Sequence, residues 1–589
     1  MKNKVLIIGI DAMDSRIVDE LELPNLKSLE TYTKLQTTIP PETPVAWSAA
    51  STGTNPGKYG IFDFINRDLQ TYMPRLNLAI EKRGIVKTEF FSLMKGIPFW
   101  RILSENNIPS TIIRWPVTFP PEKINGKMLS GLGTVDIKGM LNKYSFYTDG
   151  NFNGDEESTG NIIPIEIQNN VIETYISGPL INKGGELKDV KKLISIILKE
   201  DKLIIKIDNK DYEIGLKCWS EMIKTKFKVY FMSVYGIFKI YLESIKPTFK
   251  MYMTSVQIDP ENQIYDITYP KDYGKELEDN IGLFHTLGMP EDTKAVTENK
   301  ISESVFIEQV KQIEEERKKM FIYEFKRFNE GALACVFDAG DRLKHIFWNN
   351  RLDDDRDVIK NLSKEIKDYY AEKDKFIGNV ISQLDKNTKF IIFSDHGFST
   401  FKRQVNINSW LVKEGFMKSD GKGILFESVD WNSTQAYSLG FTSIYLNLKG
   451  RERKGIVNYG EKNDIINEII RKLKNIKDGS KTVLTNIYKG SEIYHGKYID
   501  LAPDIVLGFS PGYRMSWKNA SGGIEDEIIY DNTEKWRGDH LIDRTHVPGV
   551  LFTNFKIKRD NPAILDIAPT VLKLLDVKIP DYIDGDVLI

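Results

Sequence analysis

Three short apolar runs, each followed at once by an aspartate, constrain the fold of this chain more than any other feature. The runs are KVLIIGI, ALACVF and KFIIFS, and the aspartates that follow them are Asp11, Asp338 and Asp395. Runs of this length and apolar character are typical of strands buried in a sheet. Residues 1–133 alternate strand and helix patterns, and the segment from GVLFTN to the C-terminus does so again. These patterns predict an α/β fold with a mainly parallel central sheet and helices on both faces.

Residues 134–265 have a different, β-rich pattern. The segment LIIKIDNKDYEIGL predicts a hairpin with its turn at residues 208–210, and further β-rich segments follow it. We therefore predict an inserted β-rich subdomain at 134–265, between a first core part at 1–133 and a second at 266–589. Its aromatic side chains could line a substrate pocket, but strand cores are equally aromatic, and a core role is favoured. The amphipathic pattern at 302–329 predicts a helix with a solvated charged face.

Composition excludes several classes of protein. The 81 Lys and Arg nearly balance the 83 Asp and Glu, for a net charge of −2, which argues against a duplex nucleic-acid-binding surface. Cys218 and Cys335 are too far apart for metal-ligand spacing, and no disulfide framework is indicated. The apolar run near the N-terminus is too short for a signal peptide, and the segment VYFMSVYGIFKIYL is too short for a membrane-spanning helix. We therefore expect a soluble, cytoplasmic protein without a transmembrane segment; the sequence does not indicate its oligomeric state.

A hydroxyl residue lies at the predicted start of a helix. Thr43 ends a Pro-rich loop, Pro44 follows, and AWSAAS continues as the first helical turns. Proline suits the first helical position, so the pattern predicts Thr43 as the N-cap, where free N–H groups favour a phosphate. Most Thr-Pro pairs are only caps, but a hydroxyl at such a place is also a candidate nucleophile when its pKa is lowered.

Carboxylates and imidazoles follow the predicted strands. Asp341 and His345 are four residues apart, which places both on one helical face, and Asp395-His396 comes directly after a strand. Together with Asp11, Thr43 and His540 they form a set of seven ligands, too many for one tetrahedral ion and suitable for two. Such ligands fit zinc, or manganese, and two close metals can activate a hydroxyl and bind a phosphoryl group. Taken singly, Asp395 could be a capping residue, and Asp341 with His345 an exposed helix pair.

The other three histidines have no carboxylate at ligand spacing. His285 and His546 are expected to be structural. His495 belongs to a Gly- and Pro-rich loop and could approach a pocket.

The motifs as a set resemble a known family. KVLIIGIDAMD, ETPVAWSAASTGTNPGKYGIFDF, DAGDRLKHIFW, SDHGF, WRGDH and LDIAPTVLKLLDVKIPDYIDGDVL are similar, in this order, to the type I phosphodiesterase/nucleotide pyrophosphatase branch of the alkaline phosphatase superfamily. The resemblance implies an alkaline phosphatase-like fold and two metal ions, mostly zinc in the family. It implies that one ion is held by Asp11, Thr43, Asp395 and His396, and the other by Asp341, His345 and His540. It further implies that Thr43 is a nucleophile that forms a phospho-threonine intermediate.

The sequence departs from the family at the expected substrate contacts. Phe64, in GIFDF, stands where similar nucleotide pyrophosphatases have an asparagine, and Asn66 is near but out of register. PVAW replaces the FPNH that follows the nucleophile in that family, and the chain looks closer to a microbial subgroup that has a GIFDF segment and an inserted domain. Candidate substrate contacts are therefore Phe64, Asn66 and Arg114, and further candidate cations are Lys58 and Arg403.

Three functions are compatible with these residues. The first is a phosphodiesterase or nucleotide pyrophosphatase that acts on a small phosphoester, with nucleotides among the candidates. The second is a phosphomonoesterase or phosphonate hydrolase, because the same metal site serves both. The third is a non-catalytic protein that binds a polyanion. The complete ligand set, together with Thr43, favours an enzyme.

Overall fold

The computed structural model describes residues 3–76, 78–83, 88–150, 159–349 and 362–589. The chain forms two compact units. The first comprises Met1–Ala79, Ser92–Ser110 and Asn329–Ile589, and the second comprises Ile80–Phe91 and Thr111–Phe328. The three-part division at residues 133 and 265 stays a prediction. Among the described residues, no helix combines the length and the apolar character needed to cross a membrane.

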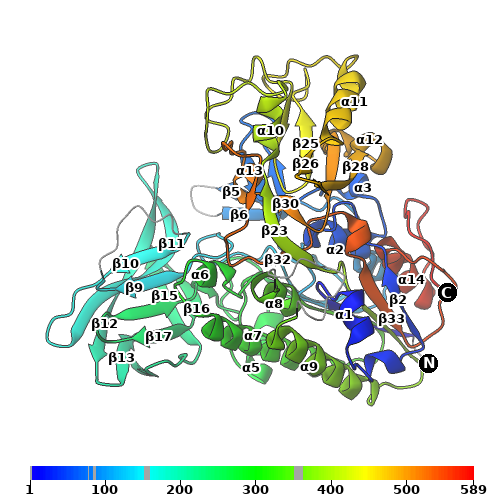
Figure 1. Cartoon of the computed structure of the whole chain (residues 1–589). Coiled ribbons are helices and arrows are strands. Elements are labelled where there is room, and N and C mark those ends of the chain that lie inside the picture. The colour runs from blue at the N-terminus through cyan, green and yellow to red at the C-terminus, as the bar shows by residue number, and fades with distance from the viewer. Residues whose placement is uncertain (1–2, 77, 84–87, 151–158, 350–361) are drawn as a thin grey trace. The chain divides into compact units, whose positions relative to one another are not determined.

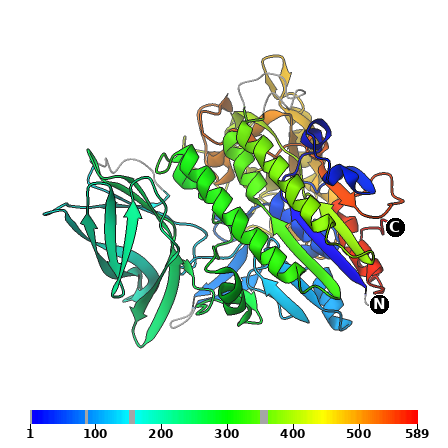
Figure 2. The same ribbon diagram turned by 90° about the horizontal axis from the view of Figure 1, so that it is seen from below.

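The three apolar runs form neighbouring strands of the first unit. Its main strands follow the hydrogen-bonded order β2 (Thr31–Leu35), β33 (Gly549–Thr553), β22 (Thr388–Phe393), β1 (Lys4–Ile10) and β21 (Gly331–Phe337). β1 pairs in parallel with both β21 and β22, and Figure 2 shows β1, in blue, beside the green β21. β33 runs antiparallel to β22 and to β2. The sheet is therefore mixed, and the expectation of a mainly parallel sheet is not confirmed.

The register of the central strands brings their C-terminal ends to one level. Ile10 pairs with Phe337, and Gly9 pairs with Phe393. Because the three strands are parallel, the residues that follow them meet at one edge of the sheet. The first helical turn of α8 (Ala339–Phe347) also begins at this edge, directly after β21.

Helices cover both faces of these strands. Trp47 of α2 (Thr43–Thr52) lies against Phe393, with ring centroids 5.0 Å apart. Phe376 of α9 (Lys364–Ile381) lies against Phe337, with centroids 5.4 Å apart. Phe393 aligns with Gly9 and Phe337 with Ile10, and successive strand residues point to opposite faces, so α2 and α9 pack on opposite sides. α14 (Ile567–Leu574) packs on α2 and on α4 (Phe99–Glu105), and α8 packs on α9.

The remainder of the first unit consists of small sheets and short helices (Figure 1). One four-stranded sheet contains β24 (Ala436–Ser438), β25 (Ser443–Leu446), β29 (Ile505–Phe509) and β28 (Leu484–Lys489). Another contains β30 (Gly512–Met515), β23 (Ser399–Val405), β31 (Ile529–Asp531) and β32 (Gly538–Asp539). Its other elements include α1 (Ser15–Glu20), α3 (Pro56–Tyr59), β3 (Ile65–Arg67), β4 (Pro74–Leu76), α10 (Ile407–Lys413), α11 (Lys462–Leu473), α12 (Gly490–Ile493), α13 (Trp517–Ala520), β26 (Lys477–Asp478) and β27 (Lys481–Thr482).

The second unit is rich in strands, coloured cyan to green in Figure 1. Its two four-stranded sheets have the orders β10 (Asn161–Pro164), β9 (Ser145–Thr148), β18 (Lys250–Met253), β17 (Ile240–Ser244), and β11 (Val171–Lys183), β12 (Glu186–Leu198), β13 (Lys202–Ile207), β14 (Lys210–Gly215). The predicted hairpin is formed by β13 and β14, with its turn at Asp208 and Asn209. A further sheet contains β15 (Ile223–Val229), β16 (Met232–Phe238) and β19 (Gln257–Ile258), and the remaining elements include β5 (Ala79–Arg83), β6 (Thr88–Ser92), β7 (Ser110–Ile113), β8 (Gly126–Leu129), β20 (Thr268–Tyr269), α5 (Tyr273–Ile281), α6 (Thr293–Thr297) and α7 (Glu303–Phe325).

Candidate functional site

All seven predicted site residues belong to the first unit and are buried at one edge of its sheet. Asp11 follows β1, and Asp395 and His396 follow β22. Asp341 and His345 lie one turn apart on α8, which the predicted four-residue spacing requires. His540 follows β32, which pairs with β23 and so returns the chain to the end of β22. Thr43 is in the first turn of α2.

The three site histidines share one hydrogen-bonding arrangement. In each, Nδ1 lies within 2.8–3.0 Å of a backbone carbonyl: that of Gly397 for His396, Gly538 for His345 and Pro41 for His540. A carbonyl only accepts, so Nδ1 carries the proton and donates. When a ring is neutral, its Nε2 is then left with a lone pair, the form in which imidazole binds a metal.

Each Nε2 faces carboxylate oxygens. His396 Nε2 lies 3.0 Å from Asp395 Oδ2 and 3.7 Å from Asp11 Oδ1. His345 Nε2 lies 3.2 Å from Asp341 Oδ2, and His540 Nε2 lies 3.7 Å from Asp341 Oδ1. Lone pairs thus point at lone pairs, an arrangement that a bound cation would turn from repulsive to attractive.

The carboxylates also have oxygens without hydrogen-bond partners. Within the described part of the chain, both oxygens of Asp11, Oδ1 of Asp341 and Oδ2 of Asp395 are buried and accept no hydrogen bond. Buried polar atoms are normally satisfied, because leaving one unpaired destabilises the folded state by about 1–3 kcal/mol. These side chains therefore fit divalent ions, which would supply the missing partners.

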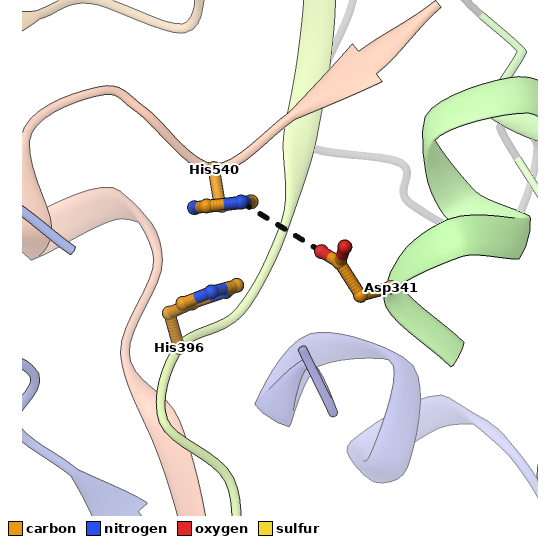
Figure 3. Close-up of side chains that lie close together, drawn as sticks. All are labelled: Asp341, His396 and His540. Atoms are coloured by element: carbon orange, nitrogen blue, oxygen red, sulfur yellow. Dashed lines mark ion pairs between the residues drawn. The ribbon is translucent and has the colours of Figure 1, made fainter. Parts of the chain in front are cut away.

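The ligand atoms form two groups that share one histidine. Asp11, Asp395 and His396 each offer an atom within 4.8 Å of the others, and so do Asp341, His396 and His540. Figure 3 shows the second group, with the imidazole rings of His396 and His540 stacked and Asp341 facing His540. The two ring centroids are 3.7 Å apart. His345 joins this group through Asp341, whereas the family resemblance places His396 with Asp11 and Asp395.

The charges of the site shift its pKa values in opposite directions. Burial, and then the neighbouring carboxylates of Asp395 and Asp341, raise the pKa of Asp11 well above its usual range. Burial likewise opposes ionisation of Asp341, but His345 and Arg342 outweigh it and hold the pKa of that carboxyl well below its usual range. Burial, and then repulsion from the His396 ring when that ring is protonated, lower the pKa of His540 to about 3. His540 is therefore neutral at neutral pH, as a metal ligand must be.

The hydroxyl of Thr43 lies next to this cluster, 3.3 Å from His396 Nε2. The prediction that Thr43 is the N-cap is wrong by one position. Glu42 has the extended backbone of an N-cap, and its carbonyl accepts the first helical hydrogen bond, from Ala46 N–H at 2.8 Å. Thr43 is thus the first helical residue, and Pro44 occupies the second position.

Of the candidate substrate contacts, Phe64 is hydrogen-bonded through its backbone to Glu42, the residue before Thr43. Its backbone N–H donates to Glu42 Oε2 at 2.8 Å, and its half-buried ring packs against a small cluster that contains Phe441 and Leu541. Asn66 uses its amide oxygen to accept the Arg67 N–H at 2.8 Å. Phe64 and Asn66 therefore stay predicted substrate contacts.

Arg114 belongs to the second unit and is buried there. Its guanidinium donates to the backbone carbonyls of Leu287 at 2.7 Å and Gly288 at 3.2 Å, and more weakly to those of Ser130 and Thr286. These bonds give Arg114 a structural role in tying loops together. Its role as a substrate contact stays a prediction.

The other candidate cations and the three histidines outside the site each interact with a side chain other than the seven predicted site residues. Lys58 and His495 both pair with Asp584, and Arg403 pairs with Asp478 at 2.9 Å. His285 pairs with Glu316 at 2.9 Å, and His546 lies 3.0 Å from the hydroxyl of Thr485.

Asp539, a buried carboxylate next to the site, was not among the predicted site residues. Asp539 accepts from Trp536 Nε1 at 2.8 Å and pairs with Arg514 Nε at 2.9 Å. Trp536 in turn stacks on His345, with ring centroids 3.7 Å apart. Asp539 therefore positions residues on both sides of the site. The signal was present in WRGDH, where Asp539 directly precedes His540.

A model of the family described as type I phosphodiesterase / nucleotide pyrophosphatase matches residues 5–540. The matched range contains all seven predicted site residues. No curated protein sequence matches this chain significantly.

Two solved structures resemble the chain weakly. Phosphonoacetate hydrolase from Sinorhizobium meliloti 1021, in complex with phosphonoacetate, is 10% identical; the alignment covers 98% of this chain and 96% of that one, with a TM-score of 0.47. An inactive form of murine ectonucleotide pyrophosphatase / phosphodiesterase 5, in complex with AMP, is 12% identical over 98% of this chain and 96% of that one, with a TM-score of 0.41. Similarities this weak do not extend to the substrate.

Proposed function

Because this chain belongs to the type I phosphodiesterase / nucleotide pyrophosphatase family, whose members are phosphoester hydrolases, we propose that it hydrolyses a small phosphodiester with Thr43 as nucleophile. One observation supports this proposal above the others. Three buried histidines, each fixed through Nδ1, direct Nε2 at carboxylate oxygens, and those that face His396 and His540 accept no hydrogen bond. The Thr43 hydroxyl lies beside His396.

Two divalent ions would be held by these side chains. The family resemblance assigns Asp11, Thr43, Asp395 and His396 to one ion and Asp341, His345 and His540 to the other. When bound, such ions supply positive charge that lowers the pKa of a hydroxyl and stabilises charge on phosphoryl oxygens. Zinc fits this mixture of imidazole and carboxylate ligands, and manganese is the alternative.

Thr43 is the residue of this chain that reacts with the substrate. Its Oγ1 forms a bond to phosphorus while the bond from phosphorus to one ester oxygen breaks, which releases the first alcohol and gives a phospho-threonine that still carries the second ester group. Water then cleaves the new bond and restores the hydroxyl, so the reaction splits into two displacements. The N-terminal turn of α2 aids both steps, because its free N–H groups and dipole favour the negative phosphoryl group.

We favour a diester over a monoester because of the surroundings of Thr43. Glu42, directly before Thr43, has a buried carboxyl group whose Oε2 accepts the backbone N–H of Phe64, and the side chain at position 64 is apolar. Burial and the nearby Asp63 raise the pKa of Glu42 well above its usual range. The second negative charge of a monoester would gain nothing from either group.

Paired assays test this proposal. Metal-stripped protein, resupplied with zinc or manganese, is given bis-p-nitrophenyl phosphate and, separately, p-nitrophenyl phosphate. We expect activity only after metal is returned, and faster hydrolysis of the diester. The matched Asp395→Asn variant should stay inactive at the same metal concentrations. Metal-independent hydrolysis would contradict the metal assignment, and preference for the monoester would contradict the substrate class.

A further inference from the structure

The second unit carries an unusual turn between β15 and β16. Val229 pairs with Met232, so Tyr230 and Phe231 alone form the turn, and Tyr230 has a φ of 51°. Two-residue hairpin turns favour Asn-Gly or Asp-Gly, because these residues adopt positive φ at little cost. Tyr230, Phe231 and Met232 are instead 73%, 106% and 58% exposed. Large apolar side chains at such a position do not serve the stability of the turn.

A second hairpin lies beside this turn. The Tyr230 hydroxyl donates to the carbonyl of Asn182 at 3.4 Å, close to the end of the β11–β12 hairpin. Asn182 pairs with Leu187, whose side chain is also exposed. Tyr230, Phe231, Met232 and Leu187 therefore form one apolar group across two adjacent hairpins, here named the hairpin-tip cluster.

Cations surround the hairpin-tip cluster. Lys226 and Lys228 alternate along the exposed side of β15, and Lys183 ends β11 beside the tip. Within the described ranges, none of these three exposed lysines forms an ion pair. In contrast, Lys224 on β15 pairs with Asp259, and Lys192 on the neighbouring β12 pairs with Asp208. Glu186, opposite Lys183 in the register, is balanced by its ion pair with Lys188 at 3.1 Å. The tip is therefore apolar at its end and has an excess of positive charge around it.

We propose that the hairpin-tip cluster binds the surface of an anionic lipid bilayer. Apolar side chains would enter the boundary between headgroups and acyl chains, with the Tyr230 hydroxyl at the polar level, while the free lysines would meet lipid phosphates. A protein partner fits less well. A stable interface needs about 800 Å² from each side. The four side chains are 73%, 106%, 58% and 46% exposed, which is less than three whole side chains, and at roughly 150–250 Å² for each large aromatic they supply less than that area.

Vesicle co-sedimentation tests this inference, which does not depend on the proposed activity. Vesicles of phosphatidylcholine alone are compared with vesicles that also contain phosphatidylglycerol. We expect the protein to bind the anionic vesicles more tightly, and added salt to weaken that binding. Tyr230→Ser combined with Phe231→Ser should weaken binding to anionic vesicles by at least about tenfold, because the apolar contact is lost.

Two further variants test the contribution of the lysines and the specificity of the apolar contact. Lys226→Glu combined with Lys228→Glu should weaken binding to anionic vesicles by about tenfold or more and leave binding to neutral vesicles unchanged. Leu193→Ser is the matched control, because Leu193 is 82% exposed on the body of β12, and its binding should equal that of the unchanged protein.

Two results would overturn the inference. One is equal vesicle binding by the unchanged protein and both tip variants. The other is concentration-dependent self-association that the aromatic substitutions abolish, without any vesicle binding. Circular dichroism of every variant, with an unchanged spectrum expected, ensures that lost binding is not lost folding.

Discussion

At the scale of single residues, the site depends on which nitrogen of each histidine carries the proton. Backbone carbonyls of Gly397, Gly538 and Pro41 fix that choice. When the rings are neutral, this arrangement directs the three Nε2 lone pairs at carboxylate oxygens of Asp11, Asp341 and Asp395. Such fixation orients ligands before a metal arrives, which lowers the entropic cost of binding it.

Substitution of Thr43 tests the role of its hydroxyl. Thr43→Ala removes the only atom proposed to attack phosphorus, so turnover should fall by about a thousandfold or more. Thr43→Ser keeps a hydroxyl and should retain measurable turnover. Steady-state hydrolysis of bis-p-nitrophenyl phosphate measures both.

A rapid-quench experiment supplies the control for Thr43. With bis-p-nitrophenyl phosphate, the unchanged protein should gain the mass of one p-nitrophenyl phosphoryl group on the peptide that contains Thr43, and the alanine variant should gain none. Near-normal turnover by the alanine variant would refute the nucleophile assignment.

The sequence was sufficient to predict that the side chains of the site come together, but not which groups hold them in place. Asp11, Asp341 and Asp395 follow or adjoin recognisable strands, so their residue types and positions carried the signal. The carbonyls of Pro41 and Gly538 are backbone atoms, which every residue type offers, so no sequence pattern marks them. Asp539 was missed for a related reason, because its partners Trp536 and Arg514 come together only in the folded chain.

At the scale of elements, α2 and β1 are in unusually close contact. A Cβ added at Gly9 would lie 2.2 Å from Cη2 of Trp47. Gly9→Ala should therefore push α2 away from β1, lower the free energy of unfolding by about 1–3 kcal/mol and reduce turnover, because α2 carries Thr43. Urea unfolding and the diester assay measure the two effects.

A compensating change distinguishes this clash from a general effect of alanine. Trp47→Phe shortens the ring that meets Gly9, so the double variant should lose less stability than the two single losses added together. Gly460→Ala is the matched control, because nothing lies within 4 Å of the added Cβ there. Strict additivity would contradict a steric origin.

The start of α6 in the second unit provides a test of pH dependence. Asp292 caps α6 through Ala295 N–H at 2.9 Å and accepts from the Tyr252 hydroxyl at 2.7 Å. Burial outweighs these bonds and raises the pKa of Asp292 from 3.8 to about 6. The native state therefore holds the proton more tightly than the unfolded state, so this contribution to stability is lost as pH rises from about 4 to about 6.

Asp292→Asn should remove that dependence. Between pH 4 and pH 7 the unchanged protein should lose up to about 3 kcal/mol relative to the variant, in urea unfolding at the two pH values. Asp211→Asn, at an exposed position of β14, should show no such change. A constant difference between the unchanged protein and the Asp292 variant would contradict the shifted pKa.

The mixed sheet shows where strand patterns stop being informative. An apolar run indicates a buried strand but carries no direction, and GVLFT gives no sign that it runs opposite to KFIIF. Direction is set by the loop before it: Ser394 N–H donates to the carbonyl of Val550, so β33 begins at the edge where β22 ends. The chain therefore pairs β33 antiparallel with β22.

At the scale of the whole molecule, the metal-free site opposes folding. Asp11 is buried with both carboxylate oxygens unpaired, close to Asp395 and His396. Burial and the neighbouring carboxylates raise its pKa, which shows that ionisation there is unfavourable in the folded state. A ligand that binds only the folded state stabilises it, by about 2.7 kcal/mol at a hundred times its dissociation constant. Metal binding should therefore reverse the effect of these charges on stability.

Asp11→Asn should reveal that reversal, because the difference in unfolding temperature between the variant and the unchanged protein should change sign when metal is added. The variant removes one buried charge, so in the presence of a chelator it should unfold at a higher temperature than the unchanged protein. With zinc or manganese in excess, the unchanged protein should be the more stable of the two, because its carboxylate binds the ion that the amide holds poorly. Scanning calorimetry with chelator and with excess metal measures the two unfolding temperatures under each condition. If the variant were less stable under both conditions, Asp11 would contribute to the metal-free fold in its own right, and if it were more stable under both, Asp11 would not be a ligand.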